Sequence, residues 1–279
     1  MCPDTARNLR QRLVALAREV PEVPVRRVVV GVHMTAVASH TVGCAYTWRE
    51  EVGAAHLCAE IRGGGRLRGL SAQELAGRLT STACLERSLG MAAVNSLITR
   101  PTPDWQEGDI LAWMKSRFAG ARIGMVGHFP FAPEIRSWAG EFHVVEKRPV
   151  EDDLPEEKGA AWLASCDAVI ITGVTLLNDT LPGIIRAASK AWKLMLGPTV
   201  PPHPLLLDLG IDALASIVCT DEEAYWPFLE EGAIVPRYLG TRPVLLARER
   251  LPLPPGDFRQ RLSQALDKGQ PHPAKENEA

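Results

Sequence analysis

The spacing of hydrophobic and polar positions predicts a mixture of helix and strand in the first hundred residues. Apolar residues recur at helical spacing in residues 5–20, and a β-branched run follows at 25–32. We expect residues 40–47 to be the hairpin partner of that strand. A capping box at residues 71–74 opens a short helix, and a longer helical stripe covers Cys84–Ile98.

From about residue 105 the pattern changes to short apolar strands separated by helical or loop segments, after a first helix at 105–118. The expected strands are Arg122–Val126, 142–145, Ala168–Thr172, 193–196, 215–218 and 244–246. The expected helical or loop segments are 132–139, Glu156–Ala164, 180–191, 205–209 and 222–229. This alternation predicts an α/β fold with a Rossmann-like, mostly parallel sheet covered on both faces.

Proline residues divide the chain into domains. Pro101 and Pro103 separate an α+β domain at residues 1–103 from a Rossmann-like ligand-binding domain at 104–250. Proline and charge dominate residues 251–279, where we expect a partly disordered tail.

Composition restricts the class of protein. Hydrophobic residues make up 46% of the 279 residues and the net charge is −2, which is typical of a globular protein and excludes a nucleic-acid-binding polycation. The cysteines are scattered without a C-x-x-C pair, which indicates reduced thiols; they are Cys2, Cys44, Cys58, Cys84, Cys166 and Cys219. The start lacks a signal-like apolar core, and no apolar run reaches 18 residues. We therefore expect a cytoplasmic protein without membrane contact.

Charge is distributed unevenly. Residues 1–100 contain 13 Arg, no Lys and 8 acidic residues, a net charge of +5, whereas the remainder carries −7. The asymmetry predicts contact between the two regions, within one chain or between two, or else a solvated Arg-rich surface. Together with seven Trp residues, it favours a homodimer.

Candidate chemistry follows from the rule that open α/β sheets bind ligands at the carboxyl ends of their strands. The strand Arg122–Val126 is followed by Gly127, His128, Phe129 and Pro130. Glycine here lets the backbone approach a ligand, although a tight turn explains it equally well. The sequence G-x-G-x-x-G of dinucleotide-binding proteins is absent from this loop.

Glu146 follows the second strand and lies 22 residues after Gly124. Rossmann folds place an acidic residue at this position to bind ribose hydroxyls. The alternative is a surface carboxylate paired with Lys147 or Arg148.

The third strand is followed by small polar residues that open a helix, namely Thr172, Gly173, Thr175, Asn178 and Thr180. Their hydroxyl, amide and backbone N–H groups suit an anion or a polar heterocycle. Ordinary helix capping by Asn178 or Thr180 is the alternative.

The fourth strand is followed by a proline-rich loop that contains Gly197, Pro198, Thr199 and His203. Rigid loops of this kind preorganise binding sites. His203 and His128 are the candidates for proton transfer, although a loop histidine more often has no catalytic role.

Several known motifs are absent from the sequence, including the P-loop, H-E-x-x-H and G-x-S-x-G. A metal site would require distant residues such as His33, His128, His203 and Cys219 to meet. For His33, which directly follows a predicted strand, a partly buried structural role is the favoured interpretation.

The ordered string of motifs resembles the DUF364 family, whose members have a Rossmann-like fold and are labelled for heavy-metal chelation. The resemblance rests on Gly127–Pro130, Glu146, Pro149, Asp153, Pro155, 166–173, Thr175, Leu176, Asn178, Thr180 and 197–199. Residues 31–37 and 89–95 resemble the companion DUF4213 domain, which implies an enolase N-terminal-like fold. The resemblance adds Asp153 to the candidate ligand-binding residues.

Three functions compete at this stage. The first is a binding protein or enzyme for a small polar ligand, linked to heavy-metal chelation or chelator metabolism. The second is a direct metal-binding protein or metallochaperone, and the third is an enzyme that uses S-adenosylmethionine or NAD. The cofactor stays open between a divalent heavy metal and a nucleotide-like ligand.

Overall fold

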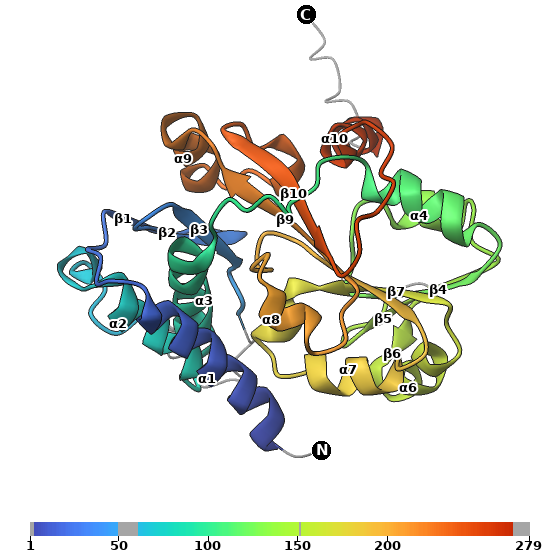
Figure 1. Cartoon of the computed structure of the whole chain (residues 1–279), viewed down its shortest axis with the longest axis horizontal. Coiled ribbons are helices and arrows are strands. Elements are labelled where there is room, and N and C mark those ends of the chain that lie inside the picture. The colour runs from blue at the N-terminus through green and yellow to red at the C-terminus, as the bar shows by residue number, and fades with distance from the viewer. Residues whose placement is uncertain (1–2, 50–60, 151, 270–279) are drawn as a thin grey trace, which may run out of the picture.

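The computed structural model describes residues 3–49, 61–150 and 152–269. Its N-terminal part contains helices α1 (Pro3–Glu19), α2 (Ala72–Gly77) and α3 (Cys84–Ile98), and strands β1 (Arg27–Val30), β2 (Met34–Ala38) and β3 (Val42–Tyr46) (Figure 1). The expected capping box is present, because the Ser71 hydroxyl accepts from the Glu74 N–H and the Glu74 carboxylate accepts from the Ser71 N–H. Helix α3 has the bounds that its apolar stripe predicts.

The predicted hairpin in this part was wrong in its pairing. The three strands form an antiparallel sheet in the order β1-β2-β3, so the partner of β1 is β2, a strand that the pattern analysis missed. All five residues of β2 are buried, and most of them are small, which removes the alternation typical of a half-buried strand. His33, expected to be partly buried, is exposed in the turn between β1 and β2.

The C-terminal part contains a seven-stranded sheet in the order β10-β9-β8-β7-β4-β5-β6, which is parallel except for β10. Its strands are β4 (Arg122–Val126), β5 (Glu141–Glu146), β6 (Leu154–Pro155), β7 (Ala168–Thr172), β8 (Trp192–Leu196), β9 (Ala213–Cys219) and β10 (Thr241–Ala247). The mixed α/β class and the mostly parallel sheet are therefore confirmed.

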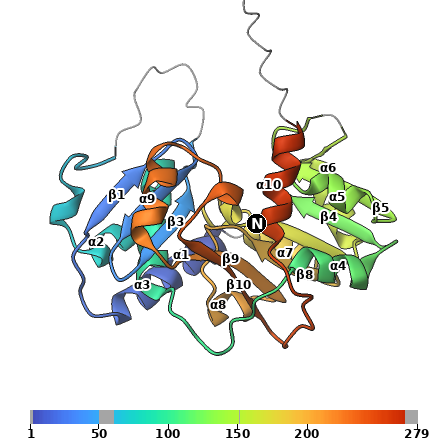
Figure 2. The same cartoon turned by 90° about the horizontal axis from the view of Figure 1, so that it is seen from above.

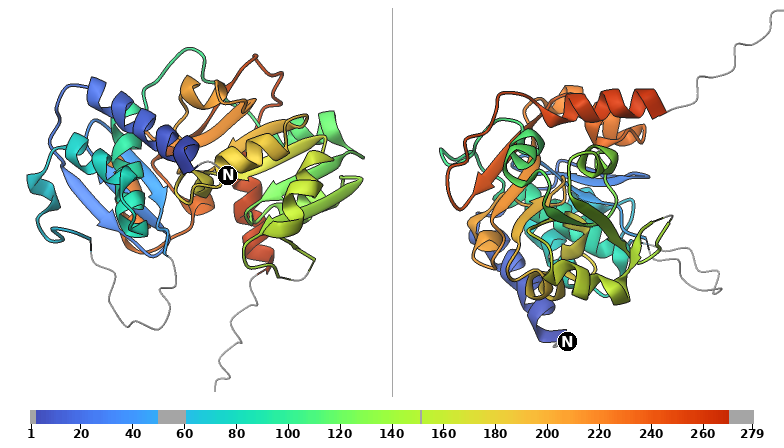
Figure 3. Two further views of the ribbon diagram at one scale, coloured as in Figure 1. Left: turned by 90° about the horizontal axis from the view of Figure 1, so that it is seen from below. Right: turned by 90° about the vertical axis from the view of Figure 1, so that its right-hand side faces the viewer.

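Helices cover both faces of this sheet (Figures 1 and 3). The helices of this part of the chain are α4 (Ile110–Phe118), α5 (Ala132–Arg136), α6 (Glu156–Ala164), α7 (Leu181–Ala187), α8 (Pro204–Leu207), α9 (Glu222–Glu230) and α10 (Phe258–Gly269). Alternate residues of each strand enter opposite cores, as in β7, where Val169 and Ile171 face one side and Ala168 and Ile170 the other. One core is closed by α6, α7 and α8, and the other by α4, α5 and α10.

Two predicted segments needed correction. Helix α4 begins at Ile110, five residues later than expected, because Gln106 pairs with Leu245 and Asp109 caps the helix by accepting from the Ala112 N–H at 2.9 Å. The region after residue 250, expected to be a partly disordered tail, contains α10 (Figure 2), whose Phe258 and Leu262 are buried in the core. The last ten residues lie outside the described residues.

The two parts of the chain are packed against each other by an apolar cluster and by ion pairs. Residues of β2 and β3 contact Tyr225, Trp226 and Leu229 of α9. The basic N-terminal region pairs with the acidic remainder: Arg10 and Arg87 contact Asp179, Arg26 contacts Glu222, and Arg27 contacts Glu230. The uneven charge along the sequence therefore gives contact within one chain. Among the helices of the described chain, none is long and apolar enough to cross a membrane.

Two buried thiols give the protein a predicted instability at high pH. Burial raises the pKa of Cys44 to about 12 and that of Cys166 to about 12, from a value of 9.0 when exposed. Above pH 9 the unfolded chain releases these protons while the folded chain keeps them, so stability present below pH 9 is lost as the pH rises toward 12. Each thiol contributes a slope of up to about 1.4 kcal/mol per pH unit.

Urea unfolding between pH 8 and pH 11 measures this slope. The variants Cys44→Ala and Cys166→Ala should each lose stability less steeply than the wild type over this range. Equal slopes in all three proteins would contradict the prediction.

Candidate functional site

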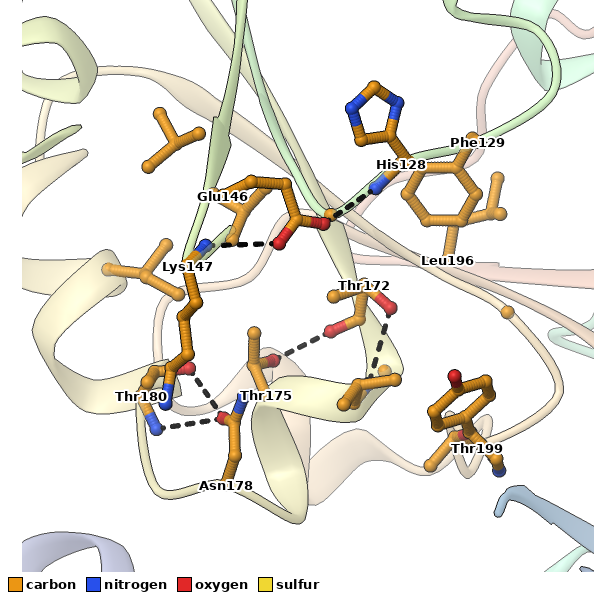
Figure 4. Close-up of a pocket in the computed structure, with 18 of the residues that line it drawn as sticks. His128, Phe129, Glu146, Lys147, Thr172, Thr175, Asn178, Thr180, Leu196 and Thr199 are labelled. Carbon is orange, nitrogen blue, oxygen red and sulfur yellow. Dashed lines mark hydrogen bonds between the residues drawn. The ribbon is translucent and has the colours of Figure 1, made fainter. Parts of the chain in front are cut away.

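The site lies at the point where the chain changes direction across the sheet. From β4 the chain continues to β5 and β6 on one side, and it then returns to β7, β8 and β9 on the other. Ligands of open α/β sheets bind in the crevice outside the carboxyl ends of the strands at such a point. A cavity of about 630 Å³ opens there, between these strand ends and the N-terminal sheet (Figure 4). This volume suits a small organic ligand.

Most of the predicted site residues meet in this cavity. Its lining includes Gly127, His128, Phe129, Glu146, Thr172, Gly173, Thr175, Asn178, Thr180, Gly197, Pro198 and Thr199. They come from the ends of four parallel strands, as the strand-end rule predicts.

Gly127 allows β4 and β7 to approach each other at the floor of the cavity. Its φ is +88°, and a Cβ atom there would lie 2.7 Å from Cγ2 of Thr172. A larger residue would therefore need both a rare backbone conformation and a displaced Thr172. The glycine of this turn keeps the crevice narrow between the two strands.

The Glu146 carboxylate is held in place by backbone groups. Oε1 accepts from the His128 N–H at 3.1 Å, and Oε2 accepts from the Lys147 N–H at 3.1 Å. These bonds join the end of β5 to the loop after β4 (Figure 4). A carboxylate has about four lone-pair sites, so two bonds leave acceptor capacity for a ligand.

The polar residues after β7 combine a structural role with a position in the cavity. The Thr172 hydroxyl accepts from the Val174 N–H at 3.3 Å, and the Thr175 hydroxyl donates to the Thr172 carbonyl at 2.7 Å. Asn178 Oδ1 accepts from the N–H and the hydroxyl of Thr180, at 3.3 and 2.7 Å. These residues therefore make the local turn hydrogen bonds that were the alternative to ligand binding, and they also line the cavity.

The loop after β8 is held by the N-terminal region. The Thr199 hydroxyl accepts from the Tyr46 N–H at 2.9 Å. The buried amide of Asn95 donates to the carbonyls of Cys44 at 2.7 Å and Thr199 at 3.2 Å. The same docking brings Met34 and Tyr46 into the cavity lining, which sequence reasoning missed because these residues lie in a different sheet.

The two candidate catalytic histidines differ in their placement, because His128 lines the cavity and His203 does not. The ring of His128 points away from Thr172 and Asn178 in Figure 4, and its Nε2 lies 2.6 Å from Oδ2 of Asp153. Asp153 and Pro130 line a neighbouring groove and not the cavity. His203 is not among the cavity-lining residues; it caps α8, with Nδ1 accepting from the Leu205 N–H at 3.2 Å. Burial lowers the pKa of His203, which favours the neutral ring.

Residues 3–49, 61–150 and 152–269 contain no group of three His, Cys, Asp or Glu side chains arranged to hold a metal ion. His33, His128, His203 and Cys219 therefore do not assemble into a site. Cys2 and Cys58 lie outside these ranges, and Cys44, Cys166 and Cys219 are free thiols.

Sequence reasoning missed further parts of the cavity wall. Lys147 also lines the cavity. Its position directly after Glu146 suggested only an ion pair with that carboxylate. Helix α6 contributes Gly159, Ala160 and Leu163. A Cβ at Gly159 would lie 2.4 Å from Cγ1 of Val145, so this glycine lets α6 lie against β5.

A doubly wound sheet with a cavity at its switch point defines a Rossmann-like α/β protein. Residues 109–242 match the DUF364 family and residues 14–98 match DUF4213, both described as "Putative heavy-metal chelation". The chain belongs to the DUF364 family, with DUF4213 as its N-terminal part.

Known proteins resemble this chain in sequence and in fold. An uncharacterised protein of Methanocaldococcus jannaschii is 30% identical over 177 residues, which span 59% of this chain and 68% of the relative. Crystal structures of DUF364 proteins with unknown function from Desulfitobacterium hafniense and Pyrococcus horikoshii both have a TM-score of 0.71. Their identities are 22% and 21%, covering 86% and 87% of this chain and 99% of each neighbour, so they support the fold.

Proposed function

We propose that the cavity binds a small organic ligand with vicinal hydroxyl groups on an apolar or heterocyclic body, as in a nucleoside. The observation that carries the proposal is the Glu146 carboxylate, fixed at the carboxyl end of β5 by the N–H groups of His128 and Lys147. A fixed carboxylate accepts hydrogen bonds from a hydroxyl pair without having to reorganise.

The rest of the cavity supports this class of ligand. Val126, Val145, Leu163 and Ile184 provide apolar wall, against which a flat heterocycle packs. Thr172, Thr175 and Thr199 add hydroxyl groups that recognise polar edges of a ring.

A nucleoside fits this site better than a dinucleotide does. The loop after β4 holds His128, Phe129 and Pro130 where dinucleotide-binding proteins place glycines that approach the pyrophosphate. The following helix, α5, has five residues and includes a proline in its first turn. These features favour a ligand without a pyrophosphate at this loop.

Both families are described by heavy-metal chelation, and the ligand of this cavity would account for that description. We propose that the bound molecule is itself a metal chelator or a precursor of one, so that the ligand and not the protein supplies the metal-binding groups. Direct binding of a metal by the protein is the competing function.

Thermal-shift and calorimetric titrations with adenosine, S-adenosylmethionine, NAD, Ni²⁺ and Zn²⁺ test the proposal. We expect a nucleoside-containing ligand to raise the melting temperature, by about 2–4 °C for each kcal/mol of linkage energy. Glu146→Gln should weaken that binding about tenfold or more, because it removes a charge-assisted hydrogen bond.

The matched control is Glu141→Gln at the opposite end of the same strand, where the carboxylate pairs with Arg122 at the surface. It should bind like the wild type. If only the metal ions raise the melting temperature, and Glu146→Gln leaves that effect intact, direct metal binding replaces the proposal.

A further inference from the structure

Lys147 places a positive charge at the mouth of the cavity, next to the hydroxyl-binding carboxylate. Its N–H donates to Oε2 of Glu146, which fixes the start of the side chain relative to that carboxylate. From there the side chain extends toward Asn178 and Thr180 in Figure 4. Within the described part of the chain, its ammonium group has no carboxylate partner. The cation is therefore available to a ligand.

Asn178 presents hydrogen-bond donors to the same corner. Its Oδ1 is occupied by the N–H and the hydroxyl of Thr180, at 3.3 and 2.7 Å. This arrangement orients the amide and leaves the Nδ2 hydrogens for another acceptor. The Thr180 hydroxyl hydrogen is used within the turn, so Lys147 and Asn178 together make a corner of donors.

The charge at this corner limits the charge of the ligand. Of the described residues that line the cavity, Lys147 carries the one Lys or Arg side chain. Glu146 stands directly beside it and Glu156 also lines the cavity, so a diphosphate or triphosphate would bring several negative charges against one cation and two carboxylates. A single acidic group is matched by Lys147 and Asn178.

We infer that the ligand carries one acidic group, a carboxylate or a phosphate monoester, which binds Lys147 Nζ and Asn178 Nδ2. The inference rests on the proposed function, since Glu146 binds the hydroxyl pair of the same molecule. Glu146 accepts hydrogen bonds from the hydroxyl pair, whereas Lys147 and Asn178 donate hydrogen bonds to the acidic group. The two ends of the ligand are therefore distinguished, which fixes its orientation along the cavity.

Calorimetric titrations with adenosine, AMP and S-adenosylhomocysteine test the inference, since the three share a nucleoside and differ in the acidic group. The wild type should bind at least one acidic compound about tenfold more tightly than adenosine. Lys147→Met should remove that preference, so that the acidic compound binds no more tightly than adenosine does. Preference for AMP would identify a phosphate, and preference for S-adenosylhomocysteine a carboxylate.

Lys158→Met on the exposed surface of α6 is the matched control, and it should retain the preference. If adenosine binds in a Glu146-dependent manner but the acidic compounds bind no better, the inference about Lys147 is wrong and the proposed function stands. If none of the three compounds binds, the proposed function and this inference both fail.

Discussion

Gly90→Ala is expected to destabilise the protein by about 3 kcal/mol or more. Alanine in a helix interior usually gains up to about 1 kcal/mol over glycine. Here a Cβ atom would lie 2.1 Å from the Leu79 backbone N and 2.6 Å from its Cα. Those atoms belong to the turn Arg78–Thr80, which packs directly on α3, and backbone cannot rotate out of the way as a side chain can.

Gly77→Ala provides the matched control because it is also a helical glycine. The nearest atom to a Cβ at this position is a guanidinium nitrogen of Arg18, at 3.8 Å. This variant should be neutral or slightly stabilised. Urea unfolding followed by circular dichroism measures both variants, and similar midpoints for the two would refute the close approach of α3 to the turn.

Asp179→Asn is expected to cost about 2 kcal/mol of folding stability. Asp179 receives Arg87 Nη1 at 2.9 Å and also contacts Arg10, and the two Arg side chains are only 11% and 7% exposed. The carboxylate itself is 36% exposed, which places the cost below that of a fully buried pair. Asparagine tolerates the φ of +66° at this position, so the substitution isolates the loss of charge.

Asp179→Ala should cost about 1 kcal/mol more, because alanine adopts the left-handed conformation less readily than asparagine or aspartate. Both variants should also weaken ligand binding, because Asp179 lies between Asn178 and Thr180. The control is Asp104→Asn, whose exposed carboxylate accepts a hydrogen bond from the Thr102 hydroxyl. If chemical denaturation shows that Asp179→Asn loses no more stability than Asp104→Asn does, the Arg10–Asp179–Arg87 cluster does not stabilise the fold.

The apolar runs along the sequence were sufficient to locate most strands of the α/β sheet, because these strands are buried on both faces. Ala168–Thr172 reads as a continuous apolar run, and the structure has β7 with the same bounds. Strand β2 was missed because its residues Met34–Ala38 are largely small and show neither alternation nor a β-branched run. Helix α10 was missed because its apolar positions are few and its sequence is rich in polar residues.

The pattern of residues is enough to predict the α/β class and the polar residues after four strands, because parallel strands bring their carboxyl ends to one edge. Which of these residues share a cavity depends on tertiary packing. It separated His203 and Asp153 from the cavity and added Met34 and Tyr46. Tyr46 and Thr199 are bonded across 153 positions of sequence. Such contacts depend on how two sheets dock through side-chain shape and charge, which no local pattern of residues records.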